Sequence, residues 1–183
     1  MIPRPFRRSL KTDSIATLYG AIVAQARSPT FYIGFGVPDT VEGRFDLIVL
    51  HLVLVLRRLG GAGQRGADLG QRLFDAFCRD LDGNLREMGV GDLAVPKRMR
   101  WFGEAFYGRQ AAYVAALAAE DPQDFEKALA RNILLAEGID NRAARLSRYA
   151  RAAARQLDAQ NDAELFDGST DFPDPEAFAD ARA

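Results

Sequence analysis

The chain has 183 residues, of which 48% are hydrophobic and 27% charged, with 24 basic and 25 acidic side chains. This balance is typical of one soluble globular domain and excludes a disordered or membrane-embedded chain. A single cysteine, Cys78, excludes an internal disulfide, and with the only histidine, His51, it cannot form a conventional zinc site. We therefore expect a reducing compartment, no metal and no cofactor.

The charges divide the chain into three parts. Residues 158–183 carry eight acidic side chains and one basic one, whereas residues 1–157 carry 23 basic and 17 acidic side chains. Residues 1–12 form a basic arm without the apolar core of a secretory signal, which favours a cytoplasmic location. We expect this arm, a helical domain over residues 13–157, and an acidic, disordered tail over residues 158–183.

Apolar residues recur every three or four positions through most of residues 13–157, which is the pattern of amphipathic helices. Residues 27–38, rich in proline, glycine and aromatic residues, are expected to form a loop over packed rings. The fold class is therefore all-α, a single compact domain of about six to seven helices. The expected helices cover residues 13–26, 39–59, 69–88, 96–119, 121–133 and 142–157.

The stretch "VPDTVEGRFDLIVLHLVLVLRRLGG" begins with polar residues and continues into an apolar run. Asp39 and Glu42 have the spacing of a capping box. The run from Leu47 to Leu56 is half the roughly 20 residues that a membrane span needs. A buried strand is an alternative for so short a run, but the length and the closing glycines favour a buried helix. His51 within it is then a core histidine rather than a catalyst.

The stretch "LREMGVGDLAVP" has the features of a helix end followed by a new helix. Gly89 suits the left-handed position of a Schellman cap, in which Val90 folds back on Leu85. Pro96 favours a helix start. Asp92 then lies in a connecting loop with no evident structural role.

Residues 142–157 place apolar side chains on one face and four arginines on the other. The basic face could meet RNA, anionic lipid or acidic partners. The arginines are Arg145, Arg148, Arg151 and Arg155.

Three phrases together resemble the ubiquinol-cytochrome c chaperone family. They are "FYIGFGVPDTVEGRFDLIVLHLVLVLRRL", "QRLFDAFCRDLDGNLREMGVGDLAVPKRM" and "EAFYGRQAAY", within residues 16–135. The resemblance implies an all-helical, non-enzymatic chaperone that holds newly made cytochrome b and supports assembly of the ubiquinol-cytochrome c reductase complex. Because no long presequence precedes them, it suggests a bacterial-type member in the cytoplasm, peripheral on the inner membrane face. The ribosome is a further candidate partner, and no small-molecule substrate is implied.

The resemblance also implies client-binding candidates. Aromatic residues would offer apolar surface, although core packing is the alternative for each of them. The charged residues could instead cap helices or form an ion network between them. The candidates are Asp39, Arg44, Arg86, Glu87, Asp92, Phe106, Tyr107 and Arg109, with Phe31, Tyr32, Phe35 and Trp101 as further apolar candidates.

Two other functions compete with this interpretation. The first is an RNA- or ribosome-associated protein that acts through the basic arm and the last helix. The second is an enzyme centred on His51. RNA binding that collapses at rising salt would support the first, and a His51→Gln variant that folds but loses assembly of the cytochrome complex would support the second.

Overall fold

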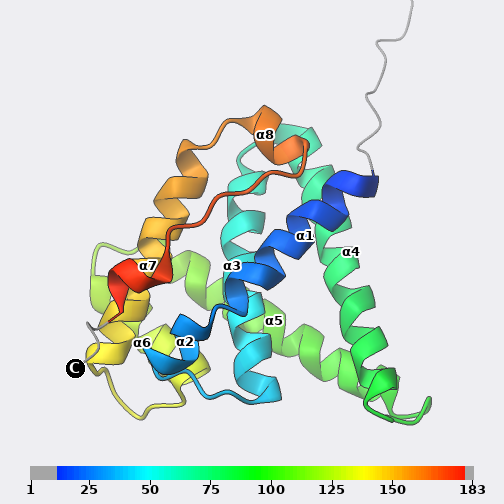
Figure 1. The fold of residues 1–183 in the computed structure, drawn as a ribbon, viewed down its shortest axis with the longest axis horizontal. Helices are drawn as coiled ribbons and strands as arrows, with labels where there is room; N and C mark the ends of the chain where they lie inside the picture. Colours follow the sequence, from blue (N-terminus) through cyan, green and yellow to red (C-terminus); the bar gives the residue numbers. More distant parts are fainter. Residues whose placement is uncertain (1–11, 180–183) are drawn as a thin grey trace, which may run out of the picture.

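The computed structural model describes residues 12–179, and every regular element in that range is helical (Figure 1). The expected all-α, single-domain fold is confirmed. Residues 1–11, with the basic charges of the expected arm, lie outside the described range. The elements are α1 (Thr12–Ala26), α2 (Pro29–Ile33), α3 (Val41–Gly60), α4 (Gly63–Glu87), α5 (Val95–Ala118), α6 (Pro122–Leu129), the π-helix η1 (Ala130–Leu134), α7 (Asn141–Ala159), α8 (Asp162–Phe166) and the 3-10 helix η2 (Pro175–Phe178).

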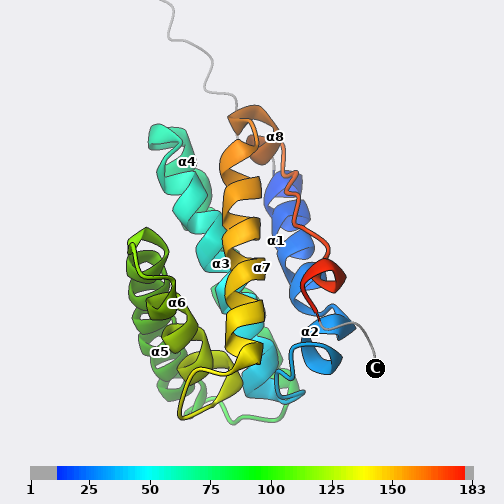
Figure 2. The same cartoon turned by 90° about the vertical axis from the view of Figure 1, so that its left-hand side faces the viewer.

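Helix α3 is the centre of the fold because its middle is apolar on every side. Each residue from Val49 to Val55 has no exposed surface. Such a helix must be covered all round, and α1, α4, α5, α7 and η1 all contact it. In Figure 2, α3 and α7 lie between α1 and α2 on one side and α5 and α6 on the other. The strand alternative is wrong for this stretch.

The start of α3 differs from the expected capping box. Thr40, not Asp39, is the N-cap residue, and its hydroxyl accepts from the Gly43 amide at 3.1 Å. Asp39 lies one residue too early and pairs with Arg44 instead. The expected loop before α3 contains the short helix α2, which places Phe31 and Phe35 in the core.

The connection from α4 to α5 has the expected geometry. Gly89 has φ of 80°, and its amide donates to Arg86 O at 3.0 Å. The Val90 amide donates to Leu85 O at 3.1 Å, which completes the Schellman motif. Helix α4 begins at Gly63, earlier than expected, so most of the glycine-rich segment is helical rather than a loop.

The expectation of a disordered tail is wrong for residues 158–179. After α7, the chain forms α8 and then returns along α1 and α7 to η2, beside α2 (Figure 1). Leu165 and Phe166 are buried, and Phe172 and Phe178 pack against His51 and Tyr149. The segment is acidic overall, but it contains these four apolar side chains. Their burial can outweigh the loss of conformational entropy when the polar segment becomes ordered.

A close backbone contact fixes the path of this segment. Gly168 has φ of 93°, and a Cβ atom there would collide with the backbone of Ser14 at 2.5 to 3.1 Å. Only glycine combines this conformation with this contact. The C-terminal segment therefore crosses α1 at a position that its own sequence specifies.

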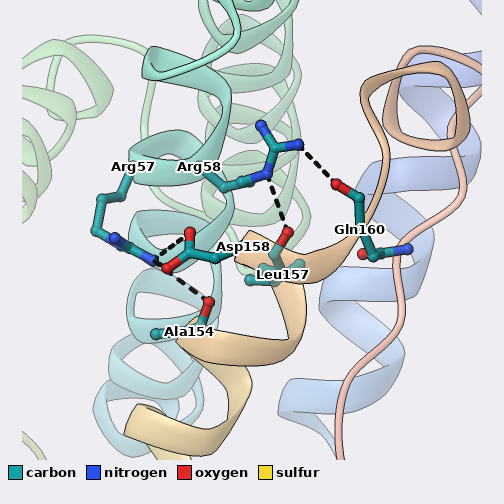
Figure 3. Close-up of polar contacts among 6 residues, drawn as sticks. All are labelled: Arg57, Arg58, Ala154, Leu157, Asp158 and Gln160. Atoms are coloured by element: carbon teal, nitrogen blue, oxygen red, sulfur yellow. Dashed lines mark hydrogen bonds and ion pairs between the residues drawn. The ribbon is translucent and has the colours of Figure 1, made fainter.

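Two arginines at the end of α3 hold the C-terminal end of α7 (Figure 3). Arg57 pairs with Asp158 at 2.6 Å and donates to Ala154 O. Arg58 donates to Leu157 O at 3.0 Å and to Gln160 O at 2.7 Å, and it pairs with Asp162. Cations at this position satisfy terminal carbonyls and interact favourably with the helix dipole. The arginines thereby connect the core helix to the start of the C-terminal segment.

Removal of residues 161–183 is expected to lower the free energy of unfolding by about 5 kcal/mol or more, because large apolar side chains contribute about 2 kcal/mol each when buried. At this chain length the melting temperature should fall by roughly 10 °C or more. Calorimetry of the shortened chain measures this change. Phe166→Ala should reproduce part of the loss, whereas Glu164→Ala on the exposed side of α8 should not. An unchanged melting temperature would contradict the packed segment.

Candidate functional site

His51 is a structural residue at the junction of three helices. Its ring has no exposed surface, and its Nδ1 lies 2.7 Å from Leu47 O, which can only accept. Nε2 therefore accepts the hydroxyl proton of Tyr149 at 2.7 Å, and that hydroxyl accepts from Gln25 Nε2 at 2.9 Å. The network joins α3, α7 and α1. The interpretation of His51 as a core histidine is confirmed.

Burial controls the protonation of this network. It lowers the pKa of His51 to about 4, although the bond to Leu47 O opposes the shift. It also raises the pKa of Tyr149. Both groups are therefore neutral at pH 7, as a dry, fully hydrogen-bonded junction requires.

Arg109 forms a largely buried ion pair with Asp46, with 2.8 Å between Arg109 Nη2 and Asp46 Oδ1. The Asp46 side chain is 4% exposed and that of Arg109 18%. Burial raises the pKa of Asp46 to about 7, while Arg109 opposes the shift. Tyr113 is buried nearby, and burial, followed by the charge of Asp46, raises its pKa. Arg109 thus fastens α5 to α3 and is not a free contact residue.

The other charged candidates lie on the surface in separate places. Asp39 and Arg44 pair at 2.7 Å before and within the first turn of α3, where the hydrogen bond from Arg44 lowers the pKa of Asp39. Arg86 pairs with Asp82 and, at 2.6 Å, with Asp92. The structure does not join these pairs and Asp46–Arg109 into one network. Glu87 is exposed beside Arg86.

The aromatic candidates divide between core and surface. Phe31, Phe35 and Phe106 are at most 1% exposed, so they belong to the core. Tyr32 is partly buried and donates its hydroxyl proton to Ala26 O. Trp101 and Tyr107 are 51% and 59% exposed, and they remain available on the surface of α5.

Tyr107 borders a groove of about 230 Å³ between α3, α4 and α5. We call it the α4–α5 groove. Its lining combines small and aromatic residues, and no charged residue lines it. The lining residues are Leu56, Leu59, Gly60, Gly66, Ala67, Gly70, Gln71, Phe74, Phe106, Tyr107 and Gln110.

The basic face of α7 is partly used in packing, which leaves less of it open to RNA, anionic lipid or acidic partners. Arg145 donates to Gly34 O and Arg151 to Ala116 O, each at 3.3 Å. Arg151 also lies over the Phe125 ring. Arg148 and Arg155 remain exposed. The helical periodicity of residues 142–157 predicted the apolar face correctly. It could not show that neighbouring elements also contact arginines on the opposite face.

Asp46, Tyr149 and Gln25 form the buried polar contacts, and the sequence interpretation omitted them. One signal was present, because Asp46 and His51 are the only polar residues between Phe45 and Leu56. Two polar residues within a buried apolar segment each need a hydrogen-bond or ion-pair partner inside the protein. The identity of these partners was not predictable, because Arg109 and Tyr149 lie far along the chain.

Among residues 12–179, no three histidine, cysteine, aspartate or glutamate side chains gather as a possible metal site. No helix within the described part of the chain is long and apolar enough to cross a membrane.

An all-helical domain with structurally engaged core charges and an uncharged surface groove has the architecture of a helical binding protein. The family model for the ubiquinol-cytochrome c chaperone matches residues 34–172, and the chain belongs to this family. The resemblance found in the sequence motifs is thus confirmed, and the match extends into the C-terminal segment.

Two relatives agree with this assignment. The chain is 24% identical over 149 residues to the ubiquinol-cytochrome-c reductase complex assembly factor 1 of Xenopus laevis, covering 81% of this chain and 74% of the relative. The crystal structure of the Cbp3 homolog from Brucella abortus matches with a TM-score of 0.83 and 37% identity. That match covers 93% of this chain and 94% of the other.

His51→Gln should show how the buried histidine responds to pH. The unfolded chain binds a proton at His51 below about pH 6.5, and the folded chain only near pH 4. The stabilisation is therefore complete above pH 6.5, and about 3 kcal/mol of it is lost as the pH falls to 4. The difference between wild type and variant in urea denaturation should shrink over this window. The raised pKa of Asp46 makes stability change with pH in the opposite direction. This contribution cancels in the difference because both proteins contain Asp46. A constant difference would contradict a neutral His51.

Arg109→Ala should lower the free energy of unfolding by about 3–5 kcal/mol at pH 8, because buried Asp46 loses its partner and must either stay charged in an apolar site or take up a proton. Asp92→Ala is the control, since its pair with Arg86 is exposed and should barely affect stability. Urea denaturation of both variants gives the comparison. Equal, small effects would contradict a structural ion pair.

Proposed function

We propose that this protein is a non-enzymatic chaperone that binds newly made cytochrome b and supports assembly of the ubiquinol-cytochrome c reductase complex. The family match over residues 34–172 carries this proposal. The name of the Xenopus laevis relative, an assembly factor of that complex, supports it. The location proposed is the cytoplasm, peripheral on the inner face of the membrane.

The α4–α5 groove is the proposed client site. An unassembled client exposes apolar helices, and small residues such as Gly70 and Ala67 allow a helix to approach closely. The absence of charge from the lining suits an apolar segment. Of the sequence candidates, Tyr107 borders this groove from the surface, whereas Phe106 forms part of its base. Asp39, Arg44, Arg86, Glu87 and Asp92 lie outside its lining, at the start of α3 and around the end of α4, and they remain candidates for separate charged contacts with the client.

The competing functions have less support. RNA or ribosome binding through the last helix would need free arginines, but Arg145 and Arg151 are engaged by carbonyls of neighbouring elements. Catalysis at His51 would need access to the ring, which is fully buried with both nitrogens bonded.

Ala67→Glu should reduce the cytochrome b that co-purifies with the tagged protein from detergent-solubilised membranes by about tenfold or more, because it places a charge in the apolar groove. Ala67 is exposed, so the fold should be unaffected. Ala16→Glu on the exposed side of α1 is the matched control. Normal co-purification by Ala67→Glu would exclude the groove. No cytochrome b with the wild-type protein would contradict the function itself.

A further inference from the structure

The connection between α4 and α5 forms a corner of the molecule, at the lower right of Figure 1. We propose that this corner, residues 88–101, here named the α4–α5 tip, docks on an anionic lipid surface. This proposal rests on the proposed peripheral location at the membrane, and the tip is the part of the chain that would make the contact.

The tip exposes large apolar side chains that its own fold does not use. Leu93 is 99% exposed, Met88 56% and Trp101 51%. The turn is closed instead by Val90, through the Schellman bond, and by buried Val95. A single exposed leucine is ordinary, but three large apolar residues at one protruding corner are characteristic of a contact surface.

Basic side chains accompany these apolar residues. Lys97, Arg98 and Arg100 are exposed, and no ion pair within residues 12–179 engages them. The one acidic residue of the tip, Asp92, is paired with Arg86. Three cations therefore face solvent without a partner, although Glu87 and Glu104 just outside the tip reduce the local excess.

Helix geometry places the charges beside the tryptophan. Lys97 and Arg98 precede Trp101 by four and three residues, so all three side chains neighbour one another on α5. Tryptophan favours the boundary between headgroups and acyl chains, while lysine and arginine bind anionic headgroups. This combination favours lipid over an acidic protein, which would not need the exposed leucine and tryptophan.

The surface expected from the sequence is less suitable for this role. On α7, Arg145 and Arg151 are bonded to backbone carbonyls, and only Arg148 and Arg155 are exposed. No large apolar residue is exposed on α7. The α4–α5 tip has both basic side chains that are unpaired within the described residues and exposed large apolar side chains.

Trp101 is the only tryptophan of the chain, so its fluorescence reports directly on the tip. With vesicles containing phosphatidylglycerol, the emission should shift to the blue and be quenched by brominated acyl chains, and high salt should reverse the binding. Vesicles of phosphatidylcholine alone should cause little change. No shift with anionic vesicles, or an equal shift with both, would overturn the proposal.

Matched charge reversals test the site. The double variant Lys97→Glu/Arg98→Glu should bind phosphatidylglycerol vesicles at least tenfold more weakly in flotation, while Arg148→Glu/Arg155→Glu, with the same change in net charge, should bind within about twofold of wild type. Leu93→Ser, at a fully exposed position that cannot disturb folding, should also weaken binding. Equal losses in the two double variants would overturn the assignment to the tip.

A protein partner is the remaining alternative. If Trp101 shifted only when detergent-solubilised cytochrome b was added, and not with vesicles, the tip would be a client site and the lipid proposal would be wrong. Co-purification of cytochrome b in detergent measures the chaperone function without a bilayer. Failure of the lipid proposal is thereby distinguishable from failure of the proposed function.

Discussion

The complete burial of the middle of α3, from Val49 to Val55, is the constraint on which the rest of the structure depends. The helix must have apolar neighbours on every side, and its two interior polar residues must find partners in places that water does not reach. Asp46 forms an ion pair with Arg109 on α5, and His51 forms a hydrogen bond with Tyr149 on α7. These two contacts fix α5 and α7 against α3, so the polar residues determine the arrangement that the apolar ones stabilise.

This arrangement determines which surfaces remain available for binding. Arg145 and Arg151, two of the four arginines on the basic face of α7, contact the loop after α2, α5 and α6 instead of solvent. An uncharged groove lies between the end of α3, the first half of α4 and the middle of α5, and an exposed basic and apolar corner lies where α4 connects to α5.

Local signals in the sequence predicted local structure well. The periodicity located α1, α3, α4, α5 and α7, and the glycine of "MGVGD" predicted a turn that the structure contains. What failed depended on contacts distant in sequence. An acidic composition suggested disorder, but Phe166 contacts Arg65 and Phe172 contacts His51, each about 100 positions or more earlier in the chain. Arg109 looked like a surface residue because Asp46, its partner, lies 63 positions earlier.

The separation of α3 and α7 in the sequence affects the order in which the protein is completed. Helix α3 ends at Gly60, and α7, which covers one of its sides, begins only at Asn141. At about 5–20 residues per second, translation needs several seconds to cross that interval. During this time the side of α3 that carries His51 lacks Tyr149 and the rest of α7. The nascent chain therefore passes through a period of uncovered apolar surface before α7 covers this side of the core.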